Sequence, residues 1–169
     1  MSVCEKLLSG KNEKRSFYLA LVCGILLGGA FMFTAGIIFL RNAILPEYEC
    51  NYSFEEMVEL FPRNIARDPA WICRKVQCGM PRMKEGERIV VYELCSSKYA
   101  SELLKNPDSR KTASMIPCQI AIYEKEGKVY LARLNLPLLT RLIGGNTAEV
   151  FSHDIIPEQK ALLHGLMKK

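Results

Sequence analysis

The hydrophobic positions of this chain fall into two regions with different patterns. Between Phe17 and Leu40 the residues are predominantly apolar and none carries a charge. A helix needs about 20 such residues to cross a hydrocarbon core, at about 1.5 Å per residue. The pattern therefore predicts a transmembrane helix over residues 17–41, with a tail over residues 1–16 before it and a connector over residues 42–52 behind it.

Basic residues next to this segment predict its orientation. Lys11, Lys14 and Arg15 stand immediately before it, whereas the far side offers Arg41 and then Glu47. Cytoplasmic flanks are enriched in Lys and Arg, so we expect a cytoplasmic N-terminus in an inner (plasma) membrane. The C-terminal domain is then periplasmic or extracellular.

A secretory signal peptide is the alternative interpretation of this segment. Its apolar region spans about 7–15 residues and ends at a small-residue cleavage site. The run observed is longer, and residues 40–44 offer no convincing site of that kind. We therefore expect the segment to be retained as a single-pass anchor in the lipid bilayer.

Small residues recur along one side of the expected membrane helix. Ala20, Gly24 and Gly28 are spaced every fourth residue, which leaves one face without bulky side chains. Such a face lets a second helix approach closely. Glycine is also common in membrane helices for other reasons, so helix pairing and chance both fit the pattern.

Residues 53–169 show the mixed periodicity of an α+β domain. Ser53 and Glu56 have the spacing of a capping box ahead of the apolar positions Phe54, Met57, Val58 and Phe61, which predicts a helix that Pro62 kinks or ends. The clearest hairpin lies around Lys125-Glu126-Gly127. We expect strands at residues 71–78, 88–94, 117–124 and 128–135, and further helices at residues 97–105, 137–143 and 157–167.

The charge of the chain argues against a nucleic-acid partner. The net charge is +5, but Lys and Arg alternate with Asp and Glu along the soluble part and form no basic run. A nucleic-acid footprint needs a clustered basic stripe. We expect solvated surfaces of mixed sign.

Several segments of the soluble part carry a resemblance to a known family: Ser53–Glu56, Tyr92–Ala100, Met115–Glu124, Gly127–Tyr130 and Gly144–Val150. Over roughly Tyr52 to Leu166 the chain resembles the domain-of-unknown-function family 302. The resemblance implies a two-layer domain, an antiparallel sheet with helices on one face, that tends to form homodimers. It implies no reaction, because a shared fold does not define a function.

Cysteine is frequent, with seven residues in the chain. Under the expected topology Cys50, Cys73, Cys78, Cys95 and Cys118 face an oxidising space, and an odd number leaves at least one thiol unpaired in a monomer. Cys73 and Cys78 are five residues apart. In a continuous strand they would point to opposite faces, so a bond between them needs a turn.

Cys95 and Cys118 lie in two of the segments that carry the resemblance. Cys95 falls where a strand gives way to a helix, and Cys118 follows Pro117 at the start of a strand. A thiol at a helix N-terminus has a lowered pKa. If the two strands are neighbours, the sulfurs could form a disulfide, a redox pair or part of a copper or zinc site, with Cys73 and Cys78 assisting. The sequence also fits two small apolar side chains buried in the core, since free cysteine packs well there.

No catalytic motif accompanies these cysteines. The sequence lacks Cys-x-x-Cys, a Gly-Lys-Ser/Thr phosphate loop and a nucleophile elbow. We therefore expect a non-enzymatic module that binds a partner or small ligand and forms a homodimer or joins a larger membrane complex as a subunit. Thiol-based redox or soft-metal handling by Cys95 and Cys118 is the alternative. The sequence indicates no particular cofactor.

Overall fold

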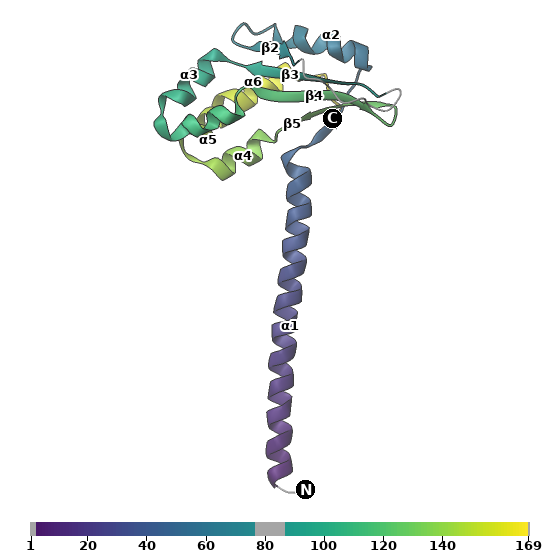
Figure 1. Cartoon of the computed structure of the whole chain (residues 1–169), viewed down its shortest axis with the longest axis vertical. Helices are drawn as coiled ribbons and strands as arrows, with labels where there is room; N and C mark the ends of the chain where they lie inside the picture. The colour runs from purple at the N-terminus through teal and green to yellow at the C-terminus, as the bar shows by residue number, and fades with distance from the viewer. Residues whose placement is uncertain (1–2, 77–86, 169) are drawn as a thin grey trace. The chain divides into compact units, whose positions relative to one another are not determined.

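The computed structural model describes residues 3–76 and 87–168. The chain divides into two compact units, residues 1–42 and residues 43–169. Helix α1 (Val3–Ile44) makes up nearly all of the first unit (Figure 1). In length and composition its apolar stretch Ser16–Ile44 suits a membrane crossing. Core helices and signal sequences satisfy the same criterion.

The apolar part of α1 contains few polar side chains, and Thr34 satisfies its own hydroxyl. Its Oγ1 donates to the carbonyl oxygens of Ala30 at 3.0 Å and Phe31 at 2.9 Å. No residue of the most apolar 18-residue window of the helix is buried against the described chain. Both features suit an environment that supplies no hydrogen bonds to the helix surface.

The second unit is built on one antiparallel sheet with the strand order β1-β5-β4-β3-β2. The strands are β1 (Glu47–Glu49), β2 (Ile72–Lys75), β3 (Ile89–Cys95), β4 (Cys118–Lys125) and β5 (Lys128–Arg133). The predicted hairpin is confirmed, since β4 and β5 meet at Glu126 and Gly127, which have φ values of 53° and 73°. Glycine and a tight two-residue turn accommodate this left-handed conformation.

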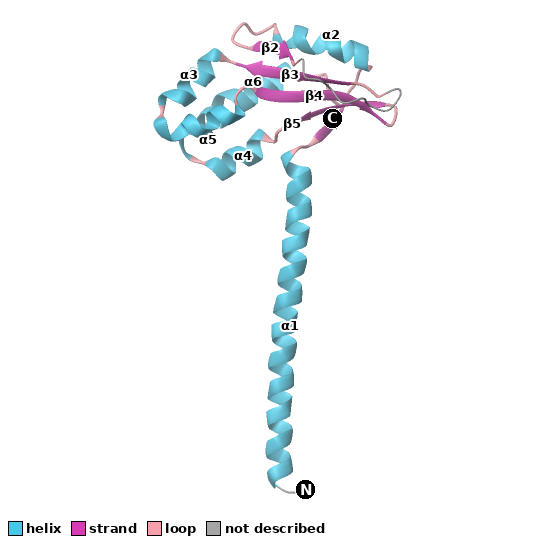
Figure 2. Cartoon of the chain, in the orientation of Figure 1, coloured by secondary structure: helices cyan, strands magenta, loops and turns pink. Residues whose placement is uncertain are grey.

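Helical segments form the second layer (Figure 2). They are α2 (Phe54–Ile65), α3 (Ser97–Lys105), the 3₁₀ segment η1 (Pro107–Met115), α4 (Leu136–Ile143), α5 (Gly145–Val150), the π-helical η2 (Phe151–Ile155) and α6 (Ile156–Leu162). Elements α3, α4 and α5 gather at the end of the sheet opposite the β4–β5 turn (Figure 1).

Large apolar side chains bury one face of the sheet under these helices. On each long strand alternate residues point to this covered face, and the buried members are Val90, Tyr92, Leu94, Ile120, Ile122 and Leu131. Met57, Phe61 and Ile65 of α2 are fully buried in the same core. The prediction of a two-layer α+β domain is confirmed.

The start of α2 follows the predicted capping box. Ser53 Oγ accepts from the backbone N–H of Glu56, and Glu56 Oε2 accepts from the backbone N–H of Ser53 at 2.8 Å. Pro62 does not end the helix, which continues to Ile65. Proline cannot donate to the carbonyl of Val58 four residues earlier, and Tyr92 Oη donates to that oxygen instead, at 3.1 Å.

The residues expected as a connector are more ordered than predicted. Within residues 42–52, α1 continues to Ile44, and β1 pairs with β5 through Tyr48 opposite Leu131. A three-residue strand is too short to give a period-2 signal of its own, so its partner strand determines it.

The C-terminal residues protect the outer edge of β1. Met167 bridges to Cys50, and the backbone N–H of Lys168 donates to Glu49 O at 2.8 Å. The side chain of Asn51 donates to the carbonyls of Gly165 and Met167 at 2.9 and 3.0 Å. Unpaired strand edges attract other chains, and this segment covers one of them.

Two predicted elements have different bounds in the structure. The strand expected over residues 71–78 is β2, which covers Ile72–Lys75, and Cys78 lies outside the described residues. The last helix was expected over residues 157–167, but helical structure resumes at Gly145 and ends at Leu162. Gly144, with φ of 67°, separates α4 from α5, and Pro157 is tolerated because it lies in the first turn of α6.

Candidate functional site on the open face of the sheet

The sheet has a second face, here called the open face, formed by the residues that alternate with the core positions. No side chain of this face is fully buried within residues 43–168. The pairing register defines its members as Glu47, Glu49, Ile72, Arg74, Ile89, Val91, Glu93, Cys95, Gln119, Ala121, Tyr123, Lys125, Lys128, Tyr130 and Ala132. The two faces thus use the same strands but very different side chains.

Small uncharged side chains occupy the centre of the open face. Val91 lies opposite Ala121, which lies opposite Ala132 on the next strand. These residues line a surface hollow together with Leu45, which is 56% exposed, and Gln119. The hollow is mainly apolar, and such surfaces serve as contact sites for another molecule.

A hydrogen-bonded cluster borders the hollow toward the β4–β5 turn. Tyr123 Oη donates to Glu47 Oε1 at 2.5 Å, and Lys125 Nζ lies 3.1 Å from Glu47 Oε2. The rings of Tyr123 and Tyr130 stack with centroids 6.1 Å apart. The bond from Tyr123, followed by that from Lys125, lowers the pKa of Glu47, and burial raises the pKa of Tyr123. The cluster holds one anionic carboxylate and one protonated phenol at neutral pH.

A second hollow lies toward β2 on the same face. Arg74 and Glu93 stand directly opposite each other, and both line it together with Cys95, Ile72 and Pro117. Glu93 also pairs with Gln119, which lines the first hollow. The two hollows therefore adjoin along one row of the sheet and offer apolar contacts with charges of both signs.

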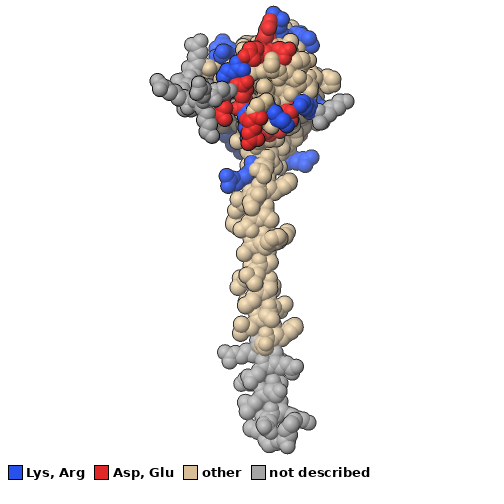
Figure 3. Space-filling view, turned by 90° about the vertical axis from the view of Figure 1, so that its right-hand side faces the viewer, with Lys and Arg blue, Asp and Glu red and all other residues tan. Residues whose placement is uncertain are grey.

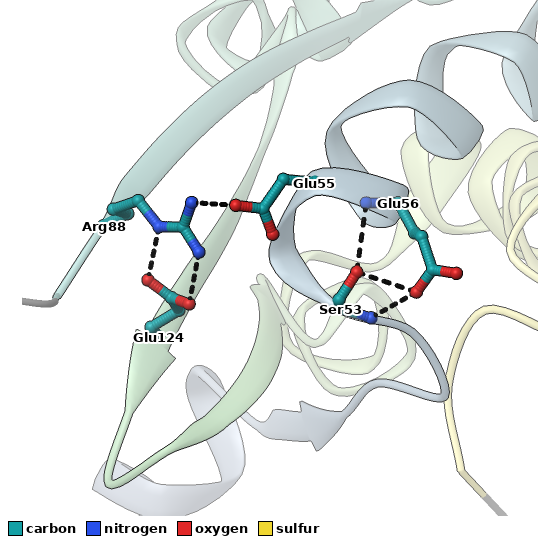
Figure 4. Close-up of polar contacts among 5 residues, drawn as sticks. All are labelled: Ser53, Glu55, Glu56, Arg88 and Glu124. Carbon is teal, nitrogen blue, oxygen red and sulfur yellow. Dashed lines mark hydrogen bonds and ion pairs between the residues drawn. The ribbon is translucent and has the colours of Figure 1, made fainter.

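Charged residues of both signs also surround the turn end of the domain (Figure 3). Arg88 binds Glu124 through two hydrogen bonds of 2.7 Å and contacts Glu55 (Figure 4). Its guanidinium also stacks on the ring of Phe54. These contacts lower the pKa of both carboxyls, with the hydrogen bond from Arg88 as the largest cause. The mixed-sign surface expected from the sequence is present here.

The structure places Cys95 and Cys118 on neighbouring strands, a condition that the sequence left open. Cys95 ends β3 one residue before Ser96, the N-cap of α3, and Cys118 begins β4. Cys118 lies opposite Leu94 and shares its covered face, so Cys95, the next residue, falls on the open side. Both residues contribute to the wall of one small cavity, and both thiols are free. Redox pairing between them stays a prediction.

Burial makes most of the described domain thiols poor nucleophiles. Burial raises the pKa of Cys73 and of Cys50 to about 11, and it also raises the pKa of Cys118. A thiolate is the reactive form of cysteine. No group of three or more His, Cys, Asp or Glu side chains suited to a metal occurs in the described ranges 3–76 and 87–168. The roles suggested for Cys73 and Cys78 stay predictions, and Cys78 is outside those ranges.

The small residues of α1 have open surroundings. A side-chain carbon added at Gly24 or Gly28 would meet no described atom within 4 Å. Ala20 is exposed on the same helix. Space for a second helix therefore exists on this side of α1, and helix pairing stays a prediction.

Sequence reasoning missed two polar arrangements. Glu158 accepts from Trp71 Nε1 at 2.8 Å and from Tyr99 Oη, and Gln159 is buried at 1% exposed. These contacts join residues more than 50 positions apart, so no local pattern indicates them.

The fold and this face define a class of protein, a two-layer α+β domain with one open sheet face behind a helix that suits a membrane crossing. The sequence model of the family "Domain of unknown function DUF302" matches residues 47–156. The chain belongs to this family, as its resemblance suggested. No curated protein matches.

A solved structure supports the fold. It is the crystal structure of an uncharacterized conserved DUF302 protein from Bacillus stearothermophilus, and the two chains are 14% identical with a TM-score of 0.55. The similarity covers 73% of this chain and 95% of that chain. At this identity the similarity establishes the architecture of the domain.

Proposed function

We propose that this protein is a membrane-anchored, non-enzymatic binding module whose open sheet face docks a second copy of the same chain. The observation that carries the proposal is the contrast within the sheet. Small uncharged residues occupy the centre of a face that no described helix of the domain buries, where they line the first of two adjoining hollows. Covering an open apolar face with another surface lowers the free energy, because apolar area is removed from water.

The chemistry of the face suits a copy of itself. A two-fold dimer places the same patch on both partners, so each charge needs an opposite charge within the patch. The open face provides the acidic residues Glu47, Glu49 and Glu93 and the basic residues Arg74, Lys125 and Lys128. Tyr123 and Tyr130 add aromatic surface, which is enriched in protein interfaces. A dimer therefore forms without a net charge penalty.

The anchor is part of this proposal. The helix Ser16–Ile44 is apolar and its hydropathy window has no buried residue. In an inner or plasma membrane with a cytoplasmic N-terminus, the domain is periplasmic or extracellular. Two copies are then restricted to one membrane plane, which raises their effective concentration, and packing along Ala20, Gly24 and Gly28 adds to the association.

The test is a charge placed at the centre of the open face. We expect the full chain in mild detergent to be dimeric by light scattering, and Ala121→Arg to be monomeric because it buries an unpaired cation in the interface. Ala161→Arg, on the exposed surface of α6, is the matched control and should stay dimeric. A monomeric parent chain contradicts the proposal that a second copy covers the open face, and so does a dimeric Ala121→Arg variant. If the parent chain instead forms a complex with another protein, the partner belongs to a larger assembly.

The anchor and its orientation have separate tests. Alkaline carbonate should leave the chain in the membrane fraction. A membrane-impermeant maleimide added to intact cells should label a cysteine introduced at Ala161, on the exposed surface of α6, more strongly than it labels the parent chain. Label that appears only after cell lysis contradicts the orientation without affecting the dimer.

Thiol chemistry is the second candidate function, because Cys95 lies beside a surface hollow as a free thiol. It requires Cys95 to react with an external disulfide or a soft metal ion. Copper or zinc retained by the parent chain and lost in Cys95→Ser supports it. Equal metal content in both proteins contradicts this second function.

A further inference from the structure

Helix α4 presents an apolar face to its surroundings. Leu136 and Thr140 are buried against the domain. At 3.6 residues per turn, about the opposite side of the helix carries Leu138, Arg141 and Leu142. Leu142 is 68% exposed, more than any other large apolar side chain described in the second unit. The outward side of a helix in a water-soluble domain normally carries polar and charged residues, so this face suits another environment.

The start of α4 is bonded to the end of the apolar stretch Ser16–Ile44. Asn135, the N-cap of α4, donates from its backbone N–H to Ile44 O at 2.9 Å and from Nδ2 to Ala43 O at 2.8 Å. Its Oδ1 accepts from the backbone N–H of Leu138 at 3.1 Å. Ala43 and Ile44 belong to the same compact unit as α4. One asparagine therefore caps α4 and fixes it to the last two residues of the stretch.

These bonds set how far α4 can lie from lipid. The uncharged run ends at Leu40, so Ile44 lies about 6 Å beyond it along the helix, within a headgroup layer that is roughly 5–8 Å thick on each side. From Asn135, Leu138 is about 4.5 Å and Leu142 about 10 Å further along α4. Both leucines are therefore within reach of the boundary between headgroups and acyl chains.

The charge of this face suits a lipid surface better than a second copy of the chain. Arg141 is exposed, and α4 contains no acidic residue. Anionic headgroups attract arginine, and the acyl boundary accepts leucine. A two-fold interface would place one Arg141 beside another and offer neither an acid within the patch. We propose that α4 lies on the surface of the bilayer that holds the anchor, with Leu138 and Leu142 at the acyl boundary and Arg141 at the lipid phosphates.

The anchor makes so small a contact sufficient. Two leucines and one arginine would hold a free domain on a membrane only weakly, but a tethered domain is always at high effective concentration near the lipid. Two points of attachment then fix the orientation of the domain on the membrane. This inference rests on the anchor proposed above and is independent of the proposed dimer.

The test places a tryptophan on this face. The full chain is reconstituted into vesicles of phosphatidylglycerol and a phosphatidylcholine that carries bromine near the headgroup end of its acyl chains. Leu142→Trp should add blue-shifted emission, most of which the bromine quenches. Glu59→Trp, on the exposed side of α2, is the matched control and should stay unquenched, since α2 and α4 lie at opposite edges of the domain (Figure 1). The parent chain gives the baseline from Trp71, which is 5% exposed.

The charge is tested in the Leu142→Trp background. Arg141→Gln should shift the equilibrium between lipid-bound and free α4 about fivefold toward the free form, which is read as weaker quenching. Arg141→Lys should restore the quenching. Both positions are exposed, so the substitutions should not affect folding, and near-ultraviolet circular dichroism verifies this.

The anchor is tested separately by washing the same vesicles with alkaline carbonate. A chain that resists carbonate but leaves the Leu142→Trp emission unquenched overturns the lipid contact of α4 and keeps the anchor. Blue-shifted emission without quenching means that protein covers this face, and equal quenching of Glu59→Trp means that the whole domain adheres unspecifically; either result overturns the inference. A chain that carbonate extracts overturns the anchor and this inference together.

Discussion

Adjacent residues of β4 show how differently the two faces of the sheet are used. Ile120 and Ile122 are 1% and 0% exposed on the covered face, whereas Ala121 between them lies half-exposed on the open face. The same alternation separates Tyr92 from Val91 on β3. The covered face determines the stability of the domain, and the open face leaves surface available for association. Substitutions on the two faces should therefore have separable effects.

The largest expected effect is the loss of a core side chain. Ile122→Ala should lower the free energy of unfolding by about 2–5 kcal/mol, because it removes buried apolar surface and leaves a cavity. Val91→Ala, on the open face of the neighbouring strand, should cost no more than about 1 kcal/mol. Urea unfolding followed by near-ultraviolet circular dichroism measures both. Equal losses would mean that the open face is also packed.

The next effect concerns the polar contacts at the margin of the core. Glu158→Ala removes the acceptor for Trp71 Nε1 and Tyr99 Oη, whose residues are 5% and 2% exposed. Two buried donors are then unpaired, and the loss should be roughly 2–3 kcal/mol. Glu158→Gln keeps one acceptor and should lose about half as much. Trp71 is the single tryptophan of the chain, so its fluorescence reports the change directly.

The smallest effect should appear at the solvent-exposed rim of the covered face. Arg88 lowers the pKa of Glu124 and Glu55 in the folded protein. A lowered folded-state pKa stabilises the fold above the ordinary carboxyl value of about 4.5, and this contribution is lost as the pH falls below it. Arg88→Met should therefore make stability less dependent on pH in this acidic window.

Urea midpoints at about pH 6 and about pH 3.5 measure this difference. Arg63→Gln is the matched control, since Arg63 pairs with Glu59 on the exposed surface of one helix and joins no other element. An unchanged acid slope in Arg88→Met would show that exposed solvent screens the cluster completely.

The elements with a local cause were predictable from the sequence. The capping box at Ser53, the β4–β5 turn and the break at Gly144 each depend on residues within a few positions of one another. The continuation of α2 past Pro62 was not predictable, because it depends on Tyr92 from another strand. Strand β1 likewise exists through its pairing with β5.

The candidate sites also divide into features with a local cause and features that depend on residues far apart in the sequence. The positions of Cys95 at the end of one strand and of Cys118 at the start of another were predictable from local motifs, whereas the adjacency of these strands depends on the pairing of β3 with β4. The faces to which they point depend on the register, which a single sequence does not specify. The burial of Gln159 depends on how α6 packs, and glutamine has no sequence signal for burial.

The pairing of Cys50 with Met167 affects how this protein can be handled in the laboratory. If a carboxypeptidase removed the residues after Leu166, the bridge from Met167 and the hydrogen bond from Lys168 would be lost and the edge of β1 would be exposed. Purification tags and fluorescent fusions at this end therefore need a flexible spacer, and samples stored with exopeptidase contamination should precipitate before they lose helical content.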